Sequence, residues 1–377
     1  TGAFTARSGR VTFDGTTAQS ISAGGSGATK RFYNFRISKS NTATLTSDIY
    51  VNNNVELVSG TLNLGSVTLE TPGAWNNTNV TVVPATSTVI FSGASSMSLT
   101  SNSQSFNHLT INKTGGNQVS LSSNTGVNGT LTITAGTLLL NGRRLDYGDG
   151  VDNTSISGIL YVDAGSTIGM HQSASIVVNN GGTLRVTGSN ASNVATITRR
   201  AATAGWRMTI NGTLRAQYAV FEYSGGNGIT IGATGLLDAV DNLSNSIFRN
   251  GTGTSYLTNN ANITHTINGV TFNAGSPTYN VTASTGNLYF TNYLGTYSGA
   301  RYENDAGPTH PGFARWKFNR ALAVTGVGSY NFNDEVVVQV TANSGLTNVA
   351  VDYRDQLYNN TYNAAYRYYR LIYTGGT

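Results

Sequence analysis

The sequence predicts an all-β protein, with a parallel β-solenoid over residues 1–318 and a small antiparallel β module over residues 319–377. Three observations lead to this fold class. Good helix formers such as Glu, Lys, Gln and Met are scarce, whereas Thr, Val, Ile and Tyr are common. Apolar residues alternate with polar ones in short blocks, as in β-strands. A glycine-containing unit also recurs along the chain at the period that is typical of a solenoid coil.

The first part of the chain contains a long internal repeat. Two stretches, one that begins at Val11 and one that begins at Val89, can be aligned so that their apolar residues stay in phase. The matching blocks are Val11–Gly15 with Val89–Gly93, Phe32–Lys39 with Phe106–Lys113, and Gly60–Leu62 with Gly136–Leu138.

A shorter unit, Gly followed by a small or branched residue and Leu, continues beyond this repeat. It occurs at Gly136–Leu138, Gly158–Leu160, Gly182–Leu184, Gly212–Leu214 and Gly235–Leu237. Each copy opens a strand with a period of two, and Gly before a strand suits a corner that needs positive φ or close backbone approach. About 300 residues at about 23 per coil give about 13 coils, or a rod about 60 Å long.

Two other architectures share parts of this pattern. A leucine-rich repeat has the same period but needs a helical segment in each unit, and the sequence contains none. A β-sandwich or jelly roll would use antiparallel hairpins with Asn-Gly turns. Asn-Gly does occur, at 128–129, 141–142, 211–212 and 268–269, so this fold stays as the alternative.

The composition excludes several classes of function. No apolar run approaches the roughly 20 residues of a transmembrane helix. Without Cys there is no disulfide scaffold, thiolate nucleophile or Cys-ligated metal. The net charge of +5 is scattered and does not indicate nucleic-acid binding. Gly, Thr, Ser and Asn make up 47% of the chain, which suits the turns and outer faces of a solenoid and is common in bacterial extracellular proteins.

The two copies of the long repeat, VTFDGTTAQSIS…FYNFRISKS…LVSGTLNL and VIFSGASSMSLT…FNHLTINKT…ITAGTLLL, resemble the repeats of large bacterial secreted surface proteins such as adhesins and autotransporter passengers. The resemblance covers most of residues 1–317 and is weaker beyond them. It implies a right-handed parallel β-helix, an extracellular or bacterial cell-surface location, and a non-catalytic role in surface structure, adhesion or fibres. No signal-peptide pattern precedes Thr1, so we expect such a peptide to be removed or to lie outside this chain.

The C-terminal part has a different character. The period breaks near Pro308 and Pro311, and the alternating runs 335–340 and 348–353 predict antiparallel strands. Tyr and Arg are favoured in binding interfaces, and the former stacks on sugar rings. An alternative is that the Tyr side chains only fill the core of a small module. The candidate binding residues are Tyr362, Tyr366, Arg367, Tyr368, Tyr369 and Arg370.

One acidic segment is a candidate Ca²⁺ site. Asp146, Asp149 and Asp152 lie close together in the sequence, and two glycines allow the backbone to bend around an ion. The spacing matches neither the EF-hand nor the calcium-binding nonapeptide, and turn formation by Asp and Gly is an equal explanation. Such an ion would be structural, and no other cofactor is expected.

Two pairs of carboxylates could serve glycoside hydrolysis. Asp238 and Asp241 could share a corner, and Glu303 and Asp305 could point to one side of a strand. The alternative is that they are outward-facing solubilising charges. The four His lack metal-ligand spacing, and neither a nucleophile elbow nor a phosphate-binding loop is present.

These observations favour a non-enzymatic extracellular rod that acts as a surface fibre subunit or an adhesin. The alternative is a polysaccharide-binding or polysaccharide-degrading β-helix protein. Because the ends of a solenoid carry unpaired strand edges, we expect the C-terminal module, a neighbouring subunit or further sequence to cover them. The expected partners are therefore other copies, packed end to end, and surface glycans. No nucleic acid is expected.

Overall fold

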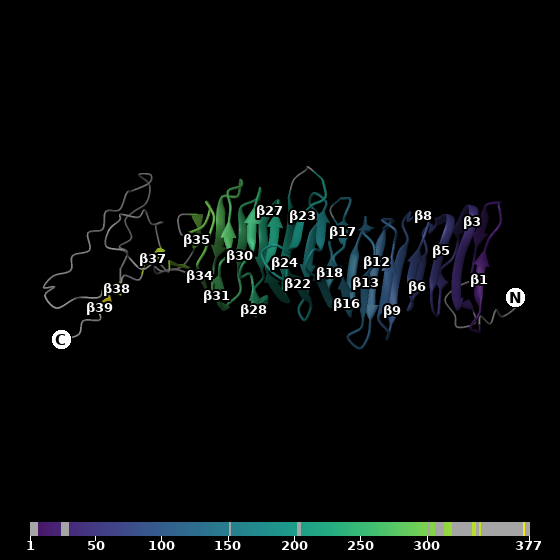
Figure 1. Ribbon diagram of the computed structural model, residues 1–377, viewed down its shortest axis with the longest axis horizontal. Helices are drawn as coiled ribbons and strands as arrows, with labels where there is room; N and C mark the ends of the chain where they lie inside the picture. The colour runs from purple at the N-terminus through teal and green to yellow at the C-terminus, as the bar shows by residue number, and fades with distance from the viewer. Residues whose placement is uncertain are drawn as a thin grey trace.

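The computed structural model describes residues 7–23, 30–150, 152–201, 205–299, 302–305 and 313–318. Beyond these it describes only the backbone of 334–336, 339–340 and 372–373. The described chain winds through about 13 turns of a parallel β-solenoid with almost no helix. Successive turns follow one another along the long axis of the molecule (Figure 1).

The first face of the solenoid is a sheet of 13 strands. Two long early strands each pair with two shorter strands of a neighbouring turn. Strand β3 pairs with β1 and β2, and β5 pairs with β7 and β8. The strands are β1 (Arg10–Phe13), β2 (Gln19–Ile21), β3 (Asn34–Leu45), β5 (Val55–Asn63), β7 (Trp75–Asn77), β8 (Val80–Val83), β10 (Met97–Thr100), β13 (Gln118–Leu121), β16 (Thr137–Leu139), β19 (Ile159–Val162), β22 (Thr183–Thr187), β25 (Thr213–Gln217) and β28 (Leu236–Asn242).

The second face is a sheet of eight strands, and the third a sheet of 12. The second consists of β11 (Ser105–Phe106), β14 (Thr125–Val127), β17 (Arg144–Tyr147), β20 (Thr167–Met170), β23 (Ala195–Arg199), β26 (Ala219–Glu222), β29 (Ile247–Arg249) and β32 (Thr271–Phe272). The third consists of β4 (Ile49–Tyr50), β6 (Thr68–Thr71), β9 (Thr88–Gly93), β12 (His108–Lys113), β15 (Leu131–Ala135), β18 (Ser155–Ile156), β21 (Ser175–Val178), β24 (Trp206–Ile210), β27 (Ser224–Ile231), β30 (Ser255–Asn259), β33 (Tyr279–Ala283) and β35 (Asn304–Asp305).

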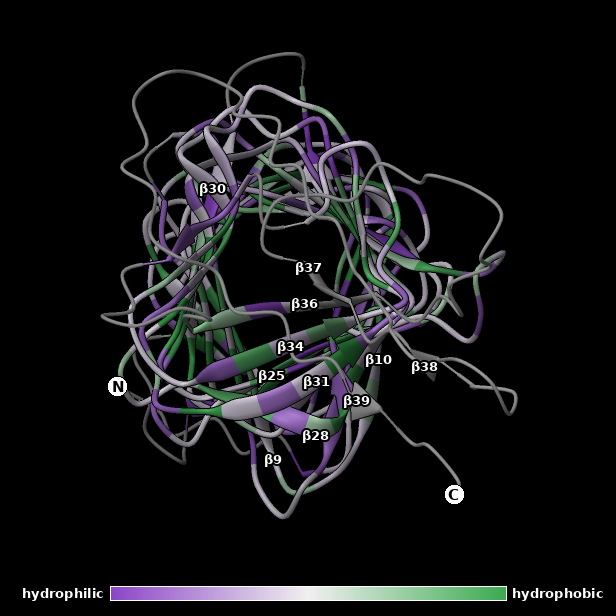
Figure 2. Cartoon of the chain, turned by 90° about the vertical axis from the view of Figure 1, so that its left-hand side faces the viewer, coloured by the Kyte–Doolittle hydropathy of each residue, from purple (hydrophilic) through white to green (hydrophobic). Residues whose placement is uncertain are grey.

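A fourth sheet continues the first face after β28. Strand β28 contacts its first strand, and Figure 2 shows β25, β28, β31, β34 and β36 along one side of the molecule. The strands of this sheet are β31 (Thr264–Asn268), β34 (Asn287–Thr291), β36 (Ala314–Phe318) and β37 (Asp334–Val336). A separate pair consists of β38 (Gln339–Val340) and β39 (Ile372–Tyr373).

In-register stacking of equivalent residues builds the core. Each turn places its inward side chain directly over that of the turn before, so one position repeats along the rod. Every residue of one such column is at most 1% exposed, and burial of each side chain contributes about 1.5–3 kcal/mol. The column consists of Ile111, Ile133, Ile156, Val178, Ile210 and Ile231.

The later turns use aromatic rings in the same way. Phe221, Phe248 and Phe272 occupy one register position on three successive strands of the second face. Their ring centroids lie 5.2 and 4.9 Å apart, and both pairs are stacked. Several of the aromatic residues that become frequent beyond about residue 201, among them these three, are thus part of the buried core.

Two lysines are buried at equivalent positions of the long repeat, a feature that the sequence analysis missed. Lys39 is 3% exposed, and its Nζ donates to Asp14 O at 2.9 Å and Gln19 Oε1 at 2.8 Å. Lys113 is fully buried, and its Nζ donates to the carbonyls of Pro72 and Ser92. Burial lowers the pKa of Lys113 to about 8, because it removes the water that stabilises the charged amine.

The fold confirms the predicted parallel β-solenoid and its expected number of turns. The domain boundary at residue 318 and the antiparallel module of residues 319–377 fall mostly outside the described residues. Of the strands described there, β37 pairs in parallel with β36, and β38 in parallel with β39.

A pair of glycine substitutions will measure the close approach between turns. Gly136 and Gly142 have similar positive φ values of 77° and 70°. A Cβ on Gly136 would lie 2.5 Å from Lys113 Cβ and 2.6 Å from Asn117 O, whereas one on Gly142 would meet nothing within 4 Å. We expect Gly142→Ala to lower the free energy of unfolding by about 1 kcal/mol, and Gly136→Ala by at least about 3 kcal/mol. Equal losses in chemical denaturation would contradict the tight packing at Gly136.

The low pKa of Lys113 makes stability depend on pH. Above about pH 8 the folded chain releases this proton while the unfolded chain keeps it to about pH 10.5, so stability rises with pH in that window. Between pH 7 and 9.5 we expect a gain of about 1–2 kcal/mol in wild type relative to Lys113→Met. Urea unfolding of both proteins at several pH values measures this difference. If the free energy of unfolding changed equally with pH in both proteins, the lowered pKa of Lys113 would be ruled out.

Candidate functional site

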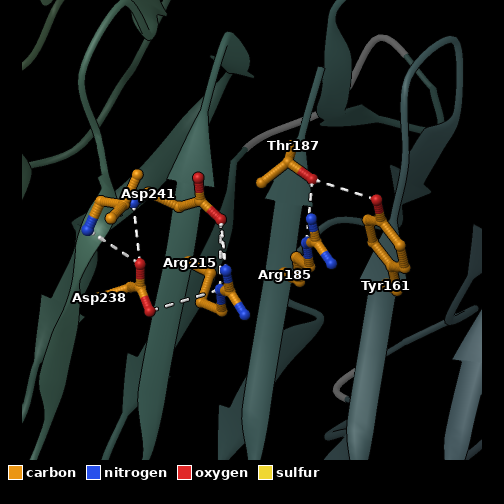
Figure 3. Close-up of polar contacts among 7 residues, drawn as sticks. Tyr161, Arg185, Thr187, Arg215, Asp238 and Asp241 are labelled. Carbon is orange, nitrogen blue, oxygen red and sulfur yellow. Dashed lines mark hydrogen bonds and ion pairs between the residues drawn. The ribbon is translucent and has the colours of Figure 1, made fainter. Parts of the chain in front are cut away.

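The short glycine units align a column of outward side chains on the first face. The residue that follows Leu in each unit points away from the core, and it occupies one register position on successive strands. Tyr161 on β19 pairs with Arg185 on β22, which pairs with Arg215 on β25. In the next turn Asp238 on β28 has the equivalent place in its unit. Four turns therefore bring an aromatic ring, two guanidinium groups and a carboxylate into one line (Figure 3).

The guanidinium group of Arg185 is fixed by its neighbours on either side. Its central carbon lies 4.3 Å from the centroid of the Tyr161 ring, a cation–π contact. Its Nε donates to Thr187 Oγ1 at 3.2 Å, and this hydroxyl donates to Tyr161 Oη at 3.4 Å. Neither Nη atom makes a hydrogen bond within the described residues, so both remain available to a ligand.

Arg215 holds the two carboxylates of the next turn. Its Nη2 lies 2.8 Å from Asp241 Oδ2, and its Nε lies 3.5 Å from Asp238 Oδ2. The pKa of Asp238 is lowered, mainly because its Oδ1 accepts the backbone N–H of Asp241 and also that of Val240, with a further contribution from Arg215. Asp238 and Asp241 thus lie close together, on strand β28 rather than at the corner suggested by the sequence, and both form ion pairs with one Arg.

A polar hollow of about 290 Å³ opens beside this column. It forms where the corner between β22 and β23 is longer than the corresponding corners of the neighbouring turns, which join β19 to β20 and β25 to β26. Its lining includes Tyr161, Asp163, Arg185, Ser189, Gln217 and Asp241. It is the candidate binding site of the described chain.

The predicted Ca²⁺ ligands do not come together. The carboxylate of Asp146 points outward from β17 and pairs with Arg144, at 2.7 Å from Nη2. Asp152 Oδ2 accepts the backbone N–H groups of Asp149 and Gly150, each at 3.0 Å, which stabilises the turn. Over the described ranges, no group of three or more His, Asp or Glu side chains could hold a metal. These hydrogen bonds support the alternative that the Asp and Gly residues of this segment form a turn.

The other candidate acidic pair stabilises the last described turns. Glu303 Oε2 accepts the indole N–H of Trp316 at 2.6 Å, and Asp305 Oδ2 accepts the backbone N–H of Ala314 at 3.0 Å. Asp146, Asp238 and Asp305 lie on the second, first and third faces respectively, so the candidate acids do not share one cleft. The candidate binding residues Tyr362, Tyr366, Arg367, Tyr368, Tyr369 and Arg370 lie outside the described residues.

The sequence analysis did not single out Tyr161, Arg185 or Arg215. A signal was present, because aligning the short units on their glycines puts these three residues and Asp238 at one position. Gln217 and Ser189 could not be found in this way, since the hollow depends on the length of a corner.

Comparison with known proteins finds no matching family model, no matching curated protein and no matching solved structure. The part of the chain that the structure describes has no helix with the length and apolar character needed to cross a membrane.

Removal of Arg215 will test how strongly it holds Asp241, whose side chain is only 11% exposed. We expect Arg215→Ala to lower the free energy of unfolding by about 1–3 kcal/mol at pH 7, because it leaves a buried carboxylate without a cation. Arg143→Ala, which removes an exposed Arg, should change it by less than about 0.5 kcal/mol.

The effect of Arg215→Ala should shrink in acid. Arg215 is one of the smaller causes of the lowered pKa of Asp238, after the backbone N–H groups of Asp241 and Val240. The part of the stabilisation that depends on Arg215 is present above the ordinary pKa of 3.8 and is lost as pH falls below it. Chemical denaturation from pH 7 to pH 3 measures this change. A pH-independent difference would show that Arg215 acts through packing alone.

Proposed function

We propose that this chain is a non-enzymatic extracellular structural protein, a β-solenoid rod that serves as a surface fibre subunit or an adhesin. The observation that carries the proposal is the continuity of the stacked sheets. About 13 turns stack in parallel around one continuous buried core. Such a rod keeps its two ends apart at a fixed distance and presents long lateral faces, which are the properties of a stalk or fibre.

The distribution of chemistry supports a structural role over catalysis. The two candidate catalytic pairs lie on different faces, and both carboxylates of the first-face pair are held by Arg215. Hydrolysis of a glycosidic bond needs one carboxyl group with a raised pKa as the acid, whereas the pKa of Asp238 is lowered. The bacterial cell-surface setting rests on the resemblance of the repeats and on the composition.

Self-association through the ends is part of the proposal. Among the described residues, β1 pairs only with β3, so its outer edge can accept a further strand. Val11 and Phe13 on this strand are only partly buried, although they pack on the core. A second copy that adds its last turn to this edge would extend the same ladder, and such head-to-tail contacts build open filaments.

The shape and assembly of the purified chain will test this proposal. Electron microscopy and sedimentation should show thin rods that join end to end as concentration rises. Thr12→Lys places a charge on the edge strand β1 and should reduce the assembly at least several-fold. Thr134→Lys, at an exposed site on the third face, is the matched control and should assemble normally.

Labelling of intact producing cells with antibodies against the chain tests its location. Surface labelling in projecting structures is the expected result. Globular particles together with an intracellular location would overturn the proposed function.

A further inference from the structure

We propose that the hollow on the first face binds a neutral saccharide unit, through hydrogen bonds to its hydroxyl groups. This inference deepens the proposed adhesive role and rests on it, because it assigns the chemical class of the ligand and the residues that hold it. The contact residues are Arg185, Gln217 and Asp241, from three successive turns.

The hollow offers donors and acceptors that have no hydrogen-bond partner among the residues that the structure describes. The two Nη atoms of Arg185 and the side-chain amide of Gln217 make no hydrogen bonds with the described chain. Asp241 is only 7% exposed, and its Oδ1 also has no hydrogen-bond partner within that part, whereas Oδ2 accepts from Arg215. None of these atoms is fully buried, so a ligand can replace the water that otherwise completes their hydrogen bonds.

Two of the three contact side chains, those of Arg185 and Asp241, are already held in position before a ligand arrives. The Tyr161 ring and Thr187 fix Arg185, and the ion pair with Arg215 fixes Asp241 (Figure 3). Binding then costs little side-chain entropy. A guanidinium group donates only, a carboxylate accepts only and an amide does both, so together they match adjacent hydroxyl groups, each of which donates and accepts.

The charge of the site favours a neutral sugar over an anionic one. Arg185 and Arg215 supply two positive charges, and Asp163, Asp238 and Asp241 supply three negative ones. The free Oδ1 of Asp241 would repel a carboxylate or sulfate placed on Arg185. Anionic polysaccharides are therefore excluded as the preferred ligand.

Because Arg185 already covers the Tyr161 ring, recognition rests on hydrogen bonds rather than on aromatic stacking.

A panel of soluble hexasaccharides will test the inference by isothermal titration with the full chain. Cello-, xylo-, laminari- and mannohexaose represent neutral sugars, and oligogalacturonate and heparin fragments represent anionic ones. We expect at least one neutral sugar to bind with a Kd of about 0.1–1 mM, as suits a shallow polar site. Arg185→Ala and Gln217→Ala should each weaken this binding at least fivefold.

Arg207→Ala is the matched control, because it removes an exposed Arg from β24 on the third face and should leave the affinity unchanged. Three results would overturn the inference: no binding of any neutral sugar, binding that both hollow variants leave intact, or a clear preference for the anionic fragments. Electron microscopy of the same preparations separates the two proposals. Rods that bind no sugar would refute only the saccharide site, and sugar binding by particles that are not rods would refute only the proposed rod.

Discussion

The structure depends on one constraint, the parallel in-register pairing of each strand with the strand one turn away. The ladder hydrogen bonds of a strand go to neighbouring turns, so each turn must place its alternating residues over those of the last. The corners are free of this requirement. Leu184 pairs directly with Leu160 on one side and with Leu214 on the other, although the second of these turns is longer, because the extra residues lie in the corners between strands.

The same constraint creates the candidate site. A single outward residue on one strand is only a surface side chain, but its equivalents in the adjoining turns lie next to it in space. Tyr161, Arg185 and Arg215 become neighbours in this way, although two full turns of chain separate the first from the last. A longer corner then turns the edge of this column into a hollow. A site in such a fold is assembled from equivalent positions of successive turns, because no single segment of the sequence contains it.

Much of the fold could be predicted because stacking leaves a period in the sequence, and Gly158, Gly182 and Gly212 mark its phase. The ion pairs between individual side chains were harder to predict. The outward direction of Asp146 follows from strand alternation, which also puts Arg144 on the same side, so that its ion pair could have been foreseen. The ion pair of Asp241 with Arg215 could not, since it joins residues of different turns at a point where the register between β25 and β28 shifts. Lys113 was missed because a buried lysine contradicts the usual preference of that residue for water.

The direction of the ladders has a mechanical consequence. The hydrogen bonds that join one turn to the next run along the rod, so a force on its two ends pulls on them lengthwise and loads the turns in series. Each turn touches only its neighbours, and one can therefore open without the rest. A tethered rod of this kind would extend in many small steps and would absorb work gradually, in contrast to a domain whose strands must all shear at once.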